Sequence, residues 1–261
     1  MAQSEGRGAG VSRRDLLATT GGFAGGFVLG ALFAGKGLPP SRAAAGDVPE
    51  WPWPYTKLDP DAVAVKAHQA FYEGGCHYAV AKAVLSELRE KVGYPYTVLP
   101  YDMFRYGEGG VVGWGSLCGA LNGAGVVINL VSAKPAYQQL TNEVVGWYTQ
   151  AEIPHYVPQG KEPMPTSVAG SPLCHVSVSK WATASGMGAE SKERAERCAR
   201  LCADVARRTV ELLNSKQDGT FKAAFTPAAG IKDCLSCHGK EDLNNVREIK
   251  MNCIQCHEPH T

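Results

Sequence analysis

Two short motifs near the C-terminus constrain this chain more than any other feature. Residues 234–238 read CLSCH and residues 253–257 read CIQCH, so each of two C-x-x-C pairs is followed at once by a histidine. Four cysteines at this spacing can hold one tetrahedral zinc ion. C-x-x-C-H is also the attachment signature of a c-type haem. The tail therefore holds either one zinc ion or two haems, and the other end of the chain decides between them.

The N-terminus has the pattern of an export signal. Arg13 and Arg14 precede a weakly apolar, glycine-rich stretch, residues 16–34, and a run of three alanines ends at Ala45. This order predicts a cleavable signal over residues 1–45, and the paired arginines indicate the twin-arginine route. A membrane anchor is the alternative, because the stretch is long enough to span a bilayer. Its many glycines make it a poor anchor, so we expect no stable membrane insertion.

Export favours haem over zinc, because bacterial c-type haems are attached outside the cytoplasm whereas zinc ribbons are mostly intracellular modules. We expect a periplasmic protein that carries two covalent haems. The cysteines of the two motifs would attach the haems, and the histidine of each motif would bind the iron: Cys234, Cys237, Cys253 and Cys256, with His238 and His257.

Charge and length point to an ordinary globular domain. The chain has 26 Lys and Arg against 25 Asp and Glu, and the predicted signal contains five of the basic and two of the acidic residues. The mature chain is thus slightly acidic, which gives no indication of a nucleic-acid partner. Its length is sufficient for one main domain with a sizeable core.

Five further cysteines lie before the tail: Cys76, Cys118, Cys174, Cys198 and Cys202. An odd number cannot all form disulfides within one chain, although two disulfides and one thiol remain an alternative. The twin-arginine route carries folded proteins, usually because a cofactor is inserted in the cytoplasm. Haem is added after export, so it does not explain this route. Four thiolates that bind an iron–sulfur cluster would explain it.

Apolar residues at helical spacing predict a mostly α-helical domain over residues 46–230, followed by an irregular tail over residues 231–261 that binds the two haems. A helix should begin with Asp59 as its N-cap and Pro60 as its first residue. It should break at Gly74-Gly75 and resume at Cys76.

Three more helices are expected further along the chain. One follows Pro135 and runs to about Gln150, and another begins at Cys174. An amphipathic helix carries Cys198 and Cys202, four residues apart on one face. A cysteine at a helix N-terminus is favoured as a thiolate by the helix dipole.

These motifs together resemble the split-Soret cytochrome c of sulfate-reducing bacteria. The resemblance rests on the haem pair, CGALNG at 118–123, LCHVSVSKW at 173–181 and the CARLCADVARRTVELLN helix. CGALNG also matches a C-G-A-x-x-G motif of a wider family of four-cysteine redox proteins. The resemblance implies a homodimer with two closely stacked, bis-histidinyl haems and one iron–sulfur centre per subunit. It places the cluster on Cys76, Cys118, Cys174 and either Cys198 or Cys202.

The second axial ligands of the haems must come from elsewhere. His175 lies in the family-like segment beside a candidate cluster cysteine, and His77 repeats this Cys-His arrangement. Neighbouring residues on a helix point about 100° apart, so a cysteine can face a cluster while the next residue faces a haem. We predict His175 and His77. His260 could reach only the other haem or a partner subunit, and Met251 is a competing ligand that ranks below histidine.

Two functions fit these features. The first is an electron carrier, in which both irons have six ligands and the protein positions redox centres for partner proteins. The second is a reductase, in which one haem is left open for a small molecule. The sequence has no Ser/His/Asp array and no Gly-rich phosphate loop, which favours the carrier. An exported zinc-binding interaction module remains only if haem is absent.

Overall fold

A computed structural model describes residues 49–228, 230–239 and 250–258. The predicted signal, with Arg13 and Arg14, lies outside these residues, and so does His260. The described part is mostly α-helical, which confirms the predicted fold class. None of the helices in these residues is both long and apolar enough to cross a membrane.

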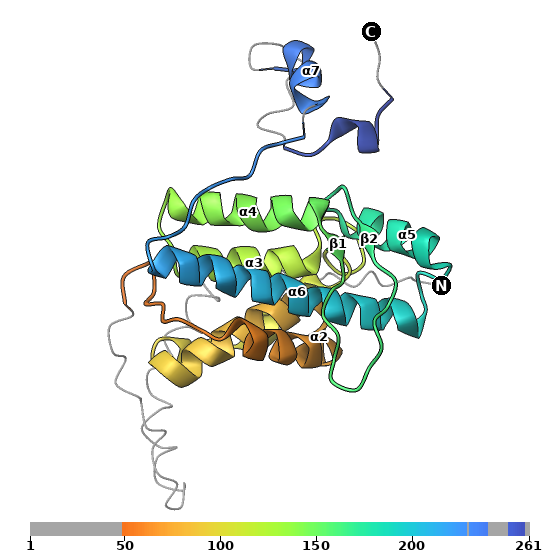
Figure 1. The fold of residues 1–261 in the computed structure, drawn as a ribbon. Coiled ribbons are helices and arrows are strands. Elements are labelled where there is room, and N and C mark those ends of the chain that lie inside the picture. Colours follow the sequence, from red (N-terminus) through yellow and green to blue (C-terminus); the bar gives the residue numbers. More distant parts are fainter. Residues whose placement is uncertain (1–48, 229, 240–249, 259–261) are drawn as a thin grey trace, which may run out of the picture. The chain divides into compact units, whose positions relative to one another are not determined.

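Four helices pack together into the main body: α2 (Pro60–Val92), α3 (Gly119–Leu130), α4 (Ala136–Gln150) and α6 (Lys192–Gln217). Helix α6 packs along α2, and α3 contacts each of the other three (Figure 1). The core between them consists mainly of small and branched side chains, such as Ala79, Val84, Ile128, Leu201 and Val205. Small side chains allow the helices to approach closely, so the core is dense around the cysteines.

Helix α2 begins and bends where the sequence predicts. The Asp59 side chain accepts hydrogen bonds from the backbone N–H groups of Asp61 (2.9 Å) and Ala62 (3.3 Å), as expected of an N-cap. Gly74 and Gly75 leave helical geometry, and Gly75 has φ of 77°. Figure 1 shows the change of direction between the two halves of α2. Cys76 is therefore the first residue of the second half.

Helices α3 and α5 (Cys174–Ser185) begin side by side. Leu117 and Leu173, which precede the two helix starts, form an isolated antiparallel bridge. The Cys118 N–H donates to Pro172 O (2.9 Å), and the Cys174 N–H donates to Ser116 O (2.7 Å). These bonds hold Cys118 and Cys174 next to each other at two helix N-termini.

Short elements complete the body. Strands β1 (Glu152–Ile153) and β2 (Ser167–Val168) pair antiparallel, with Glu152 opposite Val168 and Ile153 opposite Ser167. They join the ends of the proline-rich connection between α4 and α5. Two 3-10 helices, η2 (Tyr96–Val98) and η3 (Tyr101–Gly107), follow α2. A glycine-rich loop then leads from η3 to Cys118.

The tail contains helix α7 (Gly230–Cys237) and the 3-10 helix η4 (Cys253–Gln255). The segment that leads to it is bound to α4. The Glu143 carboxylate accepts the backbone N–H groups of Ala224 and Phe225, both at 2.6 Å. A side chain at Gly146 would collide with the Phe225 ring, so this ring lies directly on the α4 backbone.

Candidate redox-cofactor sites

The five cysteines of the helical body lie close together although they are far apart in the sequence. The Cys76 thiol lies beside those of Cys198 and Cys202, and Cys202 Sγ lies 3.7 Å from Cys76 O. Cys174 is near enough to Cys118 and Cys198 for their charges to interact. Four of the cysteines are buried, and Cys174 is partly exposed. The residues that the sequence assigned to a cluster are thus brought to one region.

Among the thiols whose pKa is shifted by their surroundings, Cys198 has the lowest pKa. A hydrogen bond from the Cys76 thiol and the positive charge of Arg197 outweigh burial and lower the pKa of Cys198 to about 6. Burial raises the pKa of Cys118 to about 12 and raises the pKa of Cys174. One thiolate beside a buried cation is therefore favoured in the protein without a bound metal.

Two glycines allow the chain to close around the cysteines. A Cβ atom at Gly119 would lie 2.4 Å from Gly107 O and 2.9 Å from Cys76 Cβ. A Cβ atom at Gly110, where φ is 68°, would lie 2.9 Å from Cys174 Cβ. The glycine-rich loop and the first turn of α3 thus contact the cysteines through their backbone.

Two buried donors in the same region have no acceptor among the described residues. They are Arg197 Nε and the hydroxyl of Tyr148, a fully buried residue of α4. Tyr148 lies beside Cys118, and Arg197 lies beside Cys198. Buried donors without acceptors are costly, so this region suits a bound anion.

The donor set fits an iron–sulfur centre in chemistry and burial. Five soft thiols surround one region, and two buried donors face it. In the described residues, however, no three His, Cys, Asp or Glu side chains are arranged as ligands of one metal ion. No two of the nine cysteines, all of which are described, form a disulfide. The cysteines are therefore gathered as free thiols.

Each C-x-x-C-H motif of the tail forms a single tight turn. The His238 N–H donates to Cys234 O (2.9 Å), and the His257 N–H donates to Cys253 O (3.0 Å). Bonds of this i to i+4 kind bring the first cysteine and the histidine to the same side of a turn. Helix α7, which carries Cys234, also contacts η4, which carries Cys253. The two motifs thus lie directly beside one another.

His175 is placed as a metal ligand would be. It lies on the exposed side of the first turn of α5, and its Nδ1 is 2.9 Å from Gly115 O. A hydrogen bond from Nδ1 to a carbonyl fixes the ring and leaves Nε2 as the free lone pair. This orientation suits the predicted role of His175 as a haem ligand.

His77 has a different setting. Its ring is fully buried between the rings of Phe104 and Tyr106, with centroid distances of 5.3 Å and 5.1 Å. Neither ring nitrogen has a hydrogen-bond partner among the residues that the structure describes, and burial lowers the pKa of His77 to about 4. His77 is brought close to the cysteines but is covered by η3, so its predicted role as a haem ligand stays a prediction.

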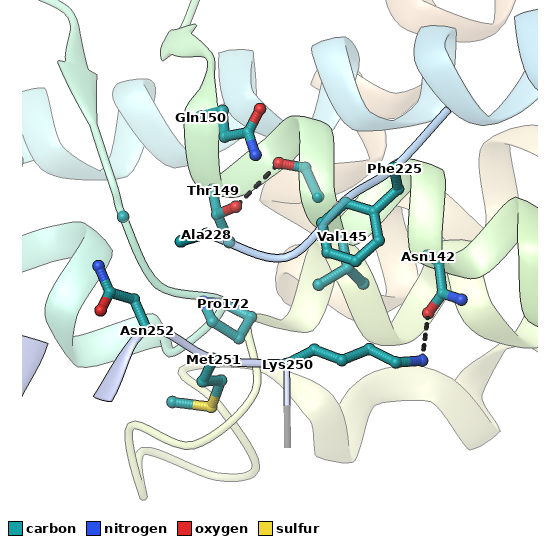
Figure 2. A pocket seen from close by; sticks show the side chains of 12 residues that line it. Asn142, Val145, Thr149, Gln150, Pro172, Phe225, Ala228, Lys250, Met251 and Asn252 are labelled. Atoms are coloured by element: carbon teal, nitrogen blue, oxygen red, sulfur yellow. Dashed lines mark hydrogen bonds between the residues drawn. The ribbon is translucent and has the colours of Figure 1, made fainter. Parts of the chain in front are cut away.

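A pocket of about 230 Å³ lies between α4 and the segments around Phe225 and Met251. Figure 2 shows the Lys250 side chain extended toward Asn142, where its Nζ donates to the amide oxygen at 3.0 Å. Met251, the competing haem ligand, contributes to the wall of this pocket. The pocket thus borders the second haem motif, which begins at Cys253.

Sequence reasoning did not identify Arg197, Tyr148 or Glu143. Arg197 directly precedes a candidate ligand on an amphipathic helix, which is a weak signal. Tyr148 and Glu143 lie on α4, far in sequence from every cysteine. Only the packing of α4 against α3 and α6 brings Tyr148 to Cys118.

Comparison with known proteins gives two concordant matches. The chain is 36% identical to the split-Soret cytochrome c of Desulfovibrio desulfuricans over 264 residues, which covers 95% of this chain and 94% of that protein. A solved structure of this cytochrome, described as containing a novel iron centre, matches with a TM-score of 0.74. That match covers 80% of this chain and 91% of the other.

Residues 78–212 match the family described as "Putative redox-active protein (C_GCAxxG_C_C)". The match includes four of the five body cysteines and begins two residues after Cys76. The Cys118-Gly119-Ala120 segment, which resembles the motif of four-cysteine redox proteins, lies within the matched residues.

Proposed function

The chain belongs to the split-Soret cytochrome c family, and from this membership we propose that it is a periplasmic electron carrier with two c-type haems and an iron–sulfur cluster. One observation carries the proposal: both C-x-x-C-H motifs form the same turn, with the first cysteine and the histidine on one side. A covalent haem needs this arrangement, since two thiols must reach its vinyl groups while the histidine reaches the iron.

The tail residues would hold the haems as follows. Cys234 and Cys237 would attach one haem and His238 would bind its iron. Cys253, Cys256 and His257 would do the same for the other haem. Bound haem iron would supply one-electron transfer between its ferric and ferrous states. The contact between α7 and η4, which carry the two motifs, supports two haems in close proximity.

His175 would complete the coordination of one haem from outside the tail. Its fixed ring and exposed Nε2 support this role. His77 is the second candidate, but it would need η3 to move away from its ring. A haem with two histidine ligands has no open position, which suits an electron carrier and excludes a substrate from the iron.

The cluster would be bound by Cys76, Cys118, Cys174 and Cys198, with Cys202 as the alternate fourth ligand. Burial of four of the five cysteines and the convergence of three helix starts on them support this assignment. A buried cluster would exchange electrons and would be protected from solvent.

Iron and haem analysis of protein purified from the periplasm tests the proposal directly. We expect two covalent haems per chain and additional iron that pyridine-haem analysis does not account for. Cys118→Ser should remove the additional iron and leave both haems, whereas Cys234→Ala with Cys237→Ala should remove one haem and leave the additional iron. One zinc ion with no haem would refute the haem assignment, and iron equal to the haem content would refute the cluster.

We propose the twin-arginine route because the cluster would have to be inserted before export. Replacing Arg13 and Arg14 by lysines should leave the precursor in the cytoplasm without haem. Directing the mature chain to a route for unfolded proteins should give haem-loaded protein without the cluster. A cluster in that protein would show that this route is not needed for cluster insertion.

Two further properties are proposed from the family alone, namely a homodimer and electron exchange with partner proteins. Sedimentation of the haem-loaded protein tests the first.

Binding of carbon monoxide tests the electron carrier against the alternative, a haem-dependent reductase. Stoichiometric binding to the reduced protein would favour the reductase, because it requires an open iron.

A further inference from the structure

Arg197 is a buried cation that has no carboxylate partner among the described residues. It lies in α6, directly before Cys198, and only 1% of it is exposed. Its Nη2 donates to Ser177 Oγ at 2.9 Å, and its Nε has no acceptor. A buried charge is strongly unfavourable unless an opposite charge compensates it.

The groups that surround Arg197 indicate where this compensation comes from. The thiol of Cys198, the hydroxyl of Tyr148 and the thiol of Cys118 are the groups that act on its charge. Tyr148 is itself a buried donor without an acceptor in the part of the chain that the structure describes. Two donors from different helices therefore face the cysteines, and cysteine sulfur is only a weak acceptor for them.

We propose that Arg197 is a positioning residue of the cysteine-bound centre, which compensates its negative charge and raises its reduction potential. This inference rests on the proposed cluster. A centre with thiolate ligands is anionic, so it would compensate the charge of Arg197 and accept hydrogen bonds from Arg197 Nε and the Tyr148 hydroxyl.

The effect on the potential follows from electrostatics. Reduction adds one electron to the centre, and a fixed positive charge nearby stabilises the reduced form more than the oxidised form. Because Arg197 is buried, salt should screen this interaction only weakly. Tyr148 would act in the same direction through its hydrogen bond, without a net charge.

Arg200 provides a matched control on the same helix. It is also buried, at 5% exposure, but its charge is already compensated. Its Nε pairs with Glu196 at 2.7 Å, and its Nη1 donates to Glu162 O at 2.8 Å. Loss of Arg200 should therefore change the equilibrium constant for reduction of the centre by less than about threefold.

The test is a potentiometric titration of the haem-loaded protein with dithionite as the electron donor. The haem potentials serve as internal references. In Arg197→Gln, reduction of the cluster should become at least about tenfold less favourable, which is about 59 mV for one electron. Arg197→Lys, which keeps the charge, should restore most of this loss, and Tyr148→Phe should shift the potential in the same direction by less.

Three results would overturn the inference while the cluster itself stands. They are an unchanged potential in Arg197→Gln, an equal shift in Arg197→Lys, and an equal shift in Arg200→Gln. If Arg197→Gln contains no cluster, Arg197→Lys decides: a retained cluster supports the charge role, and a lost one overturns it. Native protein without iron beyond its haems would instead refute the proposed cluster.

Discussion

The five body cysteines differ in what surrounds each sulfur atom. Cys198 accepts a hydrogen bond from Cys76 and lies beside Arg197, which makes it the favoured thiolate. Cys202 is completely buried, and its thiol points to the backbone carbonyl of Cys76. These settings separate the two candidates for the fourth cluster ligand, because Cys198 lies beside the Arg197 cation whereas Cys202 Sγ is directed to the Cys76 carbonyl.

Serine substitutions at these two positions should have opposite outcomes. Cys198→Ser should remove most of the non-haem iron, since serine provides no thiolate at this position. Cys202→Ser should keep the iron, because a hydroxyl can still donate to Cys76 O. Iron analysis alongside haem content measures both. The reverse pattern would make Cys202 the ligand.

His175 allows a second test with a single substitution. His175→Ala should make one haem high-spin and able to bind carbon monoxide, because Nε2 is the free ligand atom. His155→Ala is the control, since His155 is also exposed and only its backbone N–H is bound, to Asp204. Optical spectra of the reduced proteins give the answer. Unchanged spectra in His175→Ala would remove His175 from the coordination.

Among the helices and loops, the sequence was informative wherever a residue acts locally. Asp59, Pro60 and Gly74-Gly75 fix the start and the kink of α2. The η3 helix and the strand pair were not predicted, because they depend on contacts with residues far away in the sequence. The approach of Gly119 to Gly107 likewise depends on tertiary packing.

Two glycines of α3 should respond oppositely to alanine. Gly119→Ala places a Cβ atom 2.4 Å from a backbone oxygen and should lower the free energy of unfolding by about 1–3 kcal/mol. Gly125 has nothing within 4 Å of its Cβ position, so Gly125→Ala should raise it by about 0.5–1 kcal/mol. Denaturant unfolding measures both. Equal effects would mean that the contact at Gly119 relaxes freely.

At the scale of the whole molecule, the chain has two kinds of candidate site. One is formed by the haem motifs of the tail, and the other by the cysteines of the helical body. The proposed haem motifs are local, so the sequence alone predicts all six of their residues. The cysteine site is assembled from four segments, and the sequence supplies its cysteines but not its charge partner Arg197. The attachment of the tail segment to α4 through Glu143 was also not predicted, because it needs two distant segments in contact.

Glu143 should control how firmly this segment is held. Glu143→Ala removes the acceptor of two backbone N–H groups and should cost about 1–3 kcal/mol, so that proteases cleave near Phe225 faster. Both haems should remain attached, since the tail has its own ligands. Glu211→Ala, at an exposed ion pair with Arg208, should change little. Equal cleavage rates in the two variants would contradict the anchor.

The wide separation of the cysteines along the chain has a consequence for the conformational entropy of unfolding. Cys76 and Cys198, two of the proposed ligands, lie side by side although 122 positions separate them in the sequence. A centre bound to both would act as a cross-link that closes a long loop, and such loops restrict the unfolded chain the most. The cluster would thus stabilise the helical body by reducing the conformational entropy of the unfolded chain. Covalent attachment of a haem within a five-residue motif closes no such long loop.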